Sequence, residues 1–291
     1  MALASLLRLL RVKQWIKNSF VFFPLLFSGN LFTPSLVGKS LLTFVSYCLV
    51  ASSVYIFNDL IDFQKDRLHP KKAKRVLIHD QVNKGVIVVL MLGLLGAGLW
   101  MGSRINGLVV LSMGFYVLVN LVYNLITKHV VILDVIFIAT GFYLRILTGA
   151  FAIAVLPSVW LQMCVFILAL FLGFTKRRHE MTMLKARAQE HRAVLAHYTA
   201  YLLDQLIMIC STLAIVFYGL YTISPEIIAR IGGYQMVYSV TFVIYGIFRY
   251  LYLIHVKKLG DDPGEVLLSD VPLMVCVLAW ILYVGVVIYF K

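Results

Sequence analysis

Three aspartates follow a long apolar stretch at helical spacing. The run LLTFVSYCLVASSVYIF ends at Phe57, and Asp59, Asp62 and Asp66 come next, with Asn58 beside them. Residues three, four and seven apart share one face of a helix, so these carboxylates are expected to project together. Like charges this close repel, and a divalent cation removes the repulsion. Because Mg²⁺ takes one or two carboxylates plus substrate phosphates, the pattern predicts half of a magnesium–diphosphate site, with the aspartates as catalytic metal ligands.

A plain alternative is a solvated helix end, in which the acids pair with Lys65 and the next arginine. That alternative does not explain why Asn-Asp begins directly after the apolar run. A basic segment follows, and Pro70 predicts that it is a loop. Arg makes forked contacts to phosphate and Lys supplies a point charge. Beside a cation cluster, we therefore interpret Arg67, Lys72 and Arg75 as phosphate-binding residues.

The composition places these residues in a membrane protein. The 291 residues are 62% hydrophobic and 13% charged, about half the charged fraction of a soluble domain. Apolar stretches of roughly 18 or more residues indicate membrane-spanning helices, and a lipid-facing backbone favours helices. We expect an all-α integral membrane protein with one domain, 1–291, and about nine transmembrane helices, near residues 19–37, 40–62, 84–102, 107–125, 131–154, 158–175, 200–222, 235–255 and 271–289.

Basic residues are unevenly distributed between the two ends of these helices. With the N-terminus inside, the outer segments hold only Lys39, Arg104, Arg230 and Lys291. The positive-inside rule then predicts a cytoplasmic N-terminus in a multi-pass protein of the cell inner membrane. The net charge of +13 reflects this topology and attraction to anionic lipid, and it requires no nucleic-acid partner. Of the thirteen acids only Glu226 falls outside, which favours a cation-binding cytoplasmic face.

Other charged residues stand within or beside the apolar runs. Lys17, in RVKQWIKN, is either an interfacial anchor or a phosphate ligand. Asp134 begins the fifth expected helix, where the helix dipole favours an acid and where it could also serve the site. Arg145 lies about 16 Å deeper, so it needs a structural partner or a ligand phosphate. Lys176 and Arg177 end the sixth helix as an ordinary basic flank or as substrate-binding residues.

Two segments carry a resemblance to a known family. NDLIDFQKDR resembles NDxxDxxxD, the first aspartate-rich motif of the UbiA superfamily of intramembrane prenyltransferases. RVKQWIKN (Arg11–Asn18) and DRLHPKKAKR (Asp66–Arg75) are most similar to its polyprenyl-phosphate phosphoribosyltransferase branch. Val12, Ala73 and Val76 replace a Pro, an Arg and a Pro of that branch's pattern. The resemblance covers nearly the whole chain and implies a UbiA-like bundle with a cytoplasm-facing active-site cavity.

The resemblance also implies a Mg²⁺-dependent transferase. Its donor would be phosphoribosyl diphosphate and its acceptor a polyprenyl phosphate lipid of decaprenyl type, in cell-wall or polysaccharide precursor biosynthesis. Tyr123 and Lys128 resemble the branch's YxxxxK stretch, and Lys176 and Arg177 resemble its K-R-x-x-E run, which implies substrate binding. One rival is aromatic prenyl transfer from a polyprenyl diphosphate, as in quinone or haem pathways. Another is a transporter or lipid-binding protein without chemistry. Association into a homo-oligomer stays open.

Overall fold

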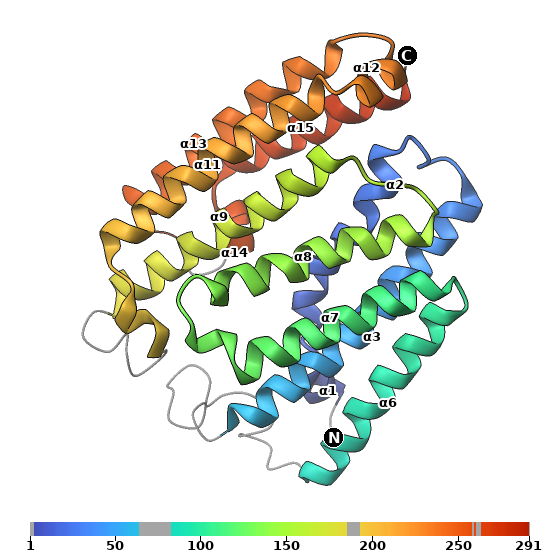
Figure 1. Cartoon of the computed structure of the whole chain (residues 1–291), viewed down its shortest axis with the longest axis vertical. Coiled ribbons are helices and arrows are strands. Elements are labelled where there is room, and N and C mark those ends of the chain that lie inside the picture. Colours follow the sequence, from blue (N-terminus) through green and yellow to red (C-terminus); the bar gives the residue numbers. More distant parts are fainter. Residues whose placement is uncertain (1–2, 64–82, 185–192, 258, 260–262, 291) are drawn as a thin grey trace. The chain divides into compact units, whose positions relative to one another are not determined.

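The computed structural model describes residues 3–63, 83–184, 193–257, 259 and 263–290. Within these ranges every regular element is a helix, as the ribbon in Figure 1 shows. Eight helical stretches are long and apolar enough to cross a membrane. These stretches are α3 (Pro34–Ile61), α6 (Lys84–Ser103), α7 (Gly107–Leu125), α8 (Leu133–Ala152), α9 (Val159–Leu184), α11 (Ala200–Thr222), η6 with α13 (Gln235–Ser239 and Val240–His255) and α15 (Val271–Tyr289). The chain is therefore a multi-pass, all-α membrane protein, as predicted.

Shorter helices join the spans. They are α1 (Leu3–Leu9), η1 (Val12–Phe22), α2 (Phe23–Phe27), η3 (Thr127–His129), η5 (Ala193–His197), α12 (Pro225–Ile231) and α14 (Pro263–Ser269), where η marks a 3₁₀ helix. The predicted first spanning α-helix, 19–37, is wrong. Pro24 lies at the start of the five-residue α2, the chain turns at Gly29 with φ of 78°, and Pro34 begins α3. Proline cannot donate a backbone hydrogen bond and glycine readily adopts positive φ, so a continuous helix does not form here.

The chain forms two compact units, and the first comprises Met1–Thr127 and Gly141–Leu156. Its central helix is α3, which packs against α6, α7 and η1. The approach of α6 depends on Gly98, because a Cβ there would lie 2.7 Å from Val50 Cγ2 and 2.9 Å from the Ser46 carbonyl oxygen. The Ser46 hydroxyl also donates to the Gly98 carbonyl at 2.5 Å. Close backbone packing of this kind is typical of helices in membranes.

The 3₁₀ helix η1 runs antiparallel along α3. Four contacts show this order, pairing Arg11 with Asp59, Trp15 with Ser52, Asn18 with Cys48 and Phe22 with Phe44. The same 3₁₀ helix also meets α8, where a Cβ at Gly149 would collide with the Val21 carbonyl. The N-terminal segment is therefore packed into the first unit.

The second unit comprises Lys128–Thr140 and Pro157–Lys291. In it α9 packs along α11, α11 against α13, and α13 against α15, around a core that includes Phe171, Leu203 and Ile254. Asp270 caps α15 by accepting the Leu273 N–H at 2.9 Å. Helix α8 begins in this unit and ends in the first. The expectation of a single domain over 1–291 stays a prediction.

Candidate functional site

Three predicted metal ligands lie together at the end of α3. Asp59 belongs to its last turn and is only 6% exposed. Asp62 is the C-cap, and its N–H bonds to the Asn58 carbonyl at 3.0 Å. The Asn58 Oδ1 atom is buried and finds no hydrogen-bond partner within the part of the chain that the structure describes. Buried polar atoms are normally hydrogen-bonded, so this oxygen is suited to a ligand.

This donor set fits a hard divalent cation as far as it is described. Two carboxylates and one amide oxygen are the ligand types that Mg²⁺ prefers. The third predicted carboxylate, Asp66, lies outside the described residues, as do Arg67, Lys72 and Arg75. Within the described ranges, no three His, Cys, Asp or Glu side chains form a metal-binding group. The magnesium site therefore stays a prediction, and it requires Asp66 as its third carboxylate.

Arg11 is the counter-ion of Asp59 in this structure. Its guanidinium forms an ion pair with the Asp59 carboxylate and lies 5.2 Å from the centre of the Tyr55 ring. The Arg11 backbone has φ of 51°, an uncommon value for a residue with a side chain. Its N–H bonds to the Arg8 carbonyl at 3.1 Å, and its carbonyl accepts the Gln14 N–H at 2.7 Å. The backbone of this arginine is thus held by hydrogen bonds on both sides.

Ser52 of α3 holds the segment on both sides of Arg11. The Ser52 hydroxyl donates to the Leu10 carbonyl at 2.8 Å and accepts the Trp15 indole N–H at 3.0 Å. The Trp15 side chain is thereby anchored to α3. Lys17 lies half-buried in the same 3₁₀ helix, and its phosphate-binding role stays a prediction.

Arg145 lies in a cage of aromatic rings and neutral acceptors. Tyr47, Tyr116 and Phe142 place their ring centres 5.3, 4.9 and 5.2 Å from its guanidinium carbon. Its Nε donates to Asn18 Oδ1 at 2.8 Å, and the two Nη atoms donate to the Gly141 carbonyl and the Tyr116 hydroxyl at 2.7 and 3.2 Å. At 4% exposure, this charge is stabilised by cation–π contacts and dipoles. Arg145 therefore has structural partners within the protein, and one of them, Asn18, belongs to η1.

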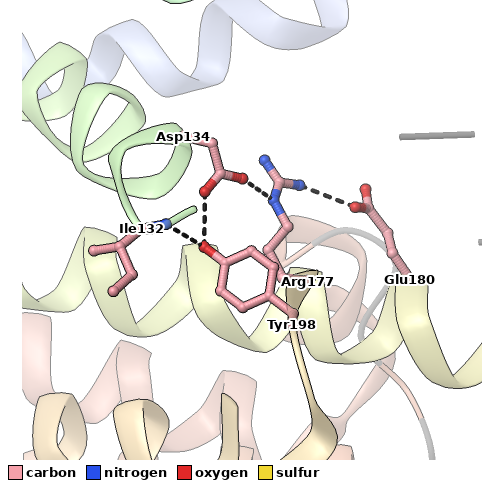
Figure 2. A network of polar contacts seen from close by, with 5 residues as sticks. All are labelled: Ile132, Asp134, Arg177, Glu180 and Tyr198. Atoms are coloured by element: carbon pink, nitrogen blue, oxygen red, sulfur yellow. Dashed lines mark hydrogen bonds and ion pairs between the residues drawn. The ribbon is translucent and has the colours of Figure 1, made fainter. Parts of the chain in front are cut away.

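A second polar network lies in the second unit (Figure 2). Arg177 of α9 donates to Asp134 Oδ2 at 2.6 Å and to Glu180 Oε2 at 2.9 Å. The Tyr198 hydroxyl donates to the other Asp134 oxygen at 2.8 Å and accepts the Ile132 N–H at 2.7 Å. Asp134 and Arg177 are 0% and 1% exposed. Both members of this buried ion pair have further hydrogen bonds, which matters because removing either partner of such a pair is costly.

The remaining predicted residues are only partly buried. Tyr123 lies near the end of α7, Lys128 in η3 and Lys176 in α9, all at intermediate exposure. They stay candidates for substrate contact. Asp270, the N-cap of α15, forms an ion pair with Arg249 at 2.8 Å. The hydrogen bonds from Arg249 hold the pKa of Asp270 below its usual value.

Comparison with known proteins identifies the group to which the sequence belongs. The model of the UbiA prenyltransferase family matches residues 19–263. The chain belongs to this family. It is accordingly an enzyme, a membrane transferase, and the UbiA resemblance drawn from the sequence is confirmed.

Two curated relatives match this UbiA-family chain along almost its entire length. The decaprenyl-phosphate phosphoribosyltransferase of Mycolicibacterium smegmatis is 28% identical, over 99% of this chain and 93% of the relative. The enzyme of the same name from Corynebacterium glutamicum is 27% identical, over 98% and 87%. A solved structure of a UbiA homologue from Archaeoglobus fulgidus bound to GPP and Mg²⁺ has a TM-score of 0.72 at 18% identity, over 98% and 99% of the two chains. That likeness shows a shared fold.

The structure adds two residues to the site of this UbiA-family chain. Sequence reasoning did not assign Arg11 to the site, because its pairing with Asp59 links residues 48 positions apart. Tyr198 follows residues 185–192, which the structure does not describe, and no motif marked it. Arg11 could have been suspected as a site residue from its place in RVKQWIKN, whereas no sequence pattern pointed to Tyr198.

Proposed function

We propose that this protein transfers a 5-phosphoribosyl group from 5-phosphoribosyl-1-diphosphate to a polyprenyl phosphate of decaprenyl type, releasing diphosphate. The observation that carries this proposal is the near full-length similarity to two enzymes named for that acceptor and that group. The oxygen donors at the end of α3 support it, because they suit a magnesium-bound diphosphate.

Asn58, Asp59 and Asp62, with Asp66, would hold Mg²⁺ in this proposal. A bound Mg²⁺ would neutralise the negative charge that develops on the leaving diphosphate. The protein side chains place that diphosphate at the end of α3. The acceptor is itself an anionic phosphate and a competent nucleophile, so the reaction requires no strong protein base. This agrees with the absence of any obvious general base among the predicted site residues.

Phosphate contacts are assigned to the partly exposed and basic residues. Lys17, Lys128 and Lys176, with Tyr123, are the described candidates. Arg67, Lys72 and Arg75 complete the assignment from the sequence alone. Asp134, Arg145 and Arg177 were also predicted to bind substrate, and this stays untested; each of them forms hydrogen bonds within the protein. We therefore propose that these three are positioning residues.

The membrane setting of the proposal follows from the charge distribution. We propose a cytoplasmic N-terminus in the inner membrane, with the aspartates facing the cytoplasm, where a soluble phosphorylated donor is available. The apolar tail of the acceptor would lie against the lipid-facing helices, whose exposed side chains are large and apolar.

The test is a donor assay in membranes that contain the overexpressed protein. With Mg²⁺, phosphoribosyl diphosphate and decaprenyl phosphate, we expect release of diphosphate and formation of a phosphoribosylated lipid. Asp59→Asn and Asp62→Asn should abolish turnover while the protein remains folded, and Glu226→Gln, an exposed acid of α12, should retain it. Turnover only with a polyprenyl diphosphate and an aromatic acceptor would replace the proposal with aromatic prenyl transfer. No turnover with any donor would favour a non-catalytic role.

A further inference from the structure

We propose that Arg11 is an internal counter-ion that Mg²⁺ must displace from Asp59, and that it then turns to the diphosphate. This inference rests on the proposed function for its metal and its donor. In this proposal Arg11 couples the binding of Mg²⁺ to the binding of diphosphate. The site therefore binds the two ligands together more tightly than it binds the metal alone.

The first support is that Arg11 already forms an ion pair with the Asp59 carboxylate, which a metal ion would need as a ligand. Its guanidinium is paired with Asp59, whose side chain is nearly buried. A metal ion that arrives alone must break this pair and leave the displaced guanidinium close to a second positive charge. In a partly buried setting that repulsion is substantial. The pair therefore opposes binding of the bare metal.

The second support is that the Arg11 backbone is held by hydrogen bonds while its side chain is partly exposed. The backbone on both sides is held by Ser52, through the Leu10 carbonyl and the Trp15 indole, and the Arg11 N–H and carbonyl are both bonded. The side chain is 22% exposed and rests over Tyr55. Because the ring can retain the guanidinium by a cation–π contact, Arg11 is able to leave Asp59 without leaving the end of α3.

The third support is the chemistry of the incoming diphosphate. A magnesium–diphosphate complex carries net negative charge, and guanidinium groups make forked contacts with phosphate oxygens. When both ligands arrive, Arg11 exchanges a carboxylate for a phosphate and stays paired. The free energy that opposes the bare metal is thus recovered, which is a positive coupling between metal and diphosphate.

The experiment measures Mn²⁺ binding by equilibrium dialysis of the full-length protein in detergent, with and without pyrophosphate as the probe. In the wild type, we expect pyrophosphate to tighten metal binding by about tenfold or more. Arg11→Gln should bind Mn²⁺ alone about tenfold tighter than the wild type, and its response to pyrophosphate should fall to about threefold or less. Lys13→Gln removes an exposed charge from the same segment and should behave as the wild type does.

Wild-type affinity for Mn²⁺ alone in folded Arg11→Gln would overturn the inference. If Arg11→Gln does not fold, Arg11→Lys carries the test. Lysine makes no forked contact, so Mn²⁺ alone should bind about threefold tighter, and an unchanged affinity would refute the exchange. The proposed function fails separately. Loss of Mn²⁺ binding in Asp59→Asn tests the metal site, whereas the donor assay tests the substrate. If the donor assay showed a different donor, the Mn²⁺ result for Arg11→Gln would still hold.

Discussion

At the residue scale, the buried charges of this protein are matched by partners of different kinds. Asp59 is paired with Arg11, Asp134 is satisfied by an arginine and a phenol, and Arg145 has neutral acceptors and aromatic faces. The choice of partner separates candidate roles, since a carboxylate paired with a partly exposed arginine at a helix end is the one for which we propose an exchange of partner. A charge enclosed by packed side chains instead fixes the elements around it.

Arg145→Lys tests whether that residue positions η1 or binds substrate. Lysine does not reproduce the three directed contacts, so acceptors such as Asn18 Oδ1 lose their donor. We expect the variant to lose about 1–3 kcal/mol of stability, measured as a lower Tm in detergent. The KM for donor in the remaining folded enzyme should be nearly unchanged. Arg104→Lys, at an exposed arginine, is the control and should change stability by less than about 0.5 kcal/mol. A large increase in KM at full stability would instead indicate substrate contact.

Tyr198→Phe tests the network in Figure 2. The variant deprives Asp134 of a donor and the Ile132 N–H of an acceptor, so we expect a loss of about 1–3 kcal/mol. Burial raises the pKa of Tyr198 above its ordinary value, which is about 10. The stability that the neutral phenol provides is therefore fully present below that pH and is lost as pH rises toward the folded-state pKa. The Tm difference between wild type and variant should shrink above about pH 10, and a constant difference would contradict this account.

At the element scale, the close approach of α3 and α6 depends on one glycine. Gly98→Ala would place a methyl group 2.9 Å from a backbone oxygen, which is unable to move without shifting α3. We expect a loss of about 1–3 kcal/mol, seen as a lower Tm. Gly93→Ala lies on the same helix, where a Cβ meets no atom within 4 Å, and it should be neutral or slightly stabilising. Equal effects of the two variants would argue against close helix packing as the cause.

The sequence predicted the regular helices well and η1 badly. The expected ranges for α7, α11 and α15 agree with the structure, because apolar length alone defines a span. Residues of η1 follow a period of three, with Trp15, Asn18 and Val21 all directed into the protein and Ile16 73% exposed. In an α-helix this set would drift around the axis by about 120° from first to last. Pattern analysis at a period of 3.6 does not detect such a segment.

At the scale of the whole molecule, the two groups of site residues were predictable to different extents. The aspartates were found because their spacing is local, whereas the Arg11–Asp59 pair depends on how η1 packs along α3. Asp134 and Arg177 were both named as candidate site residues, but no pattern in the sequence pairs residues 43 positions apart. Contacts of this range are set by tertiary packing, which composition and periodicity do not encode.

The number of membrane crossings leads to a topology prediction. Eight helices qualify as spans within the described residues, yet η1 and α2 together cover about 30 Å, close to the thickness of a bilayer core. We expect them to provide a ninth crossing, so that the two termini lie on opposite sides. A reporter fused at the N-terminus should be cytoplasmic, and one fused at the C-terminus external. Finding both on the same side would restrict the crossings to eight.

The 3₁₀ form of η1 also acts as a spacer. Its eleven residues extend about 22 Å, whereas the same residues coiled as an α-helix would extend about 16 Å. Only the longer form lets Phe22 reach Phe44 while Arg11 still reaches Asp59. Deleting one residue between Arg11 and Phe22 would therefore move the Arg11 guanidinium away from the Asp59 carboxylate, although both residues would still be present.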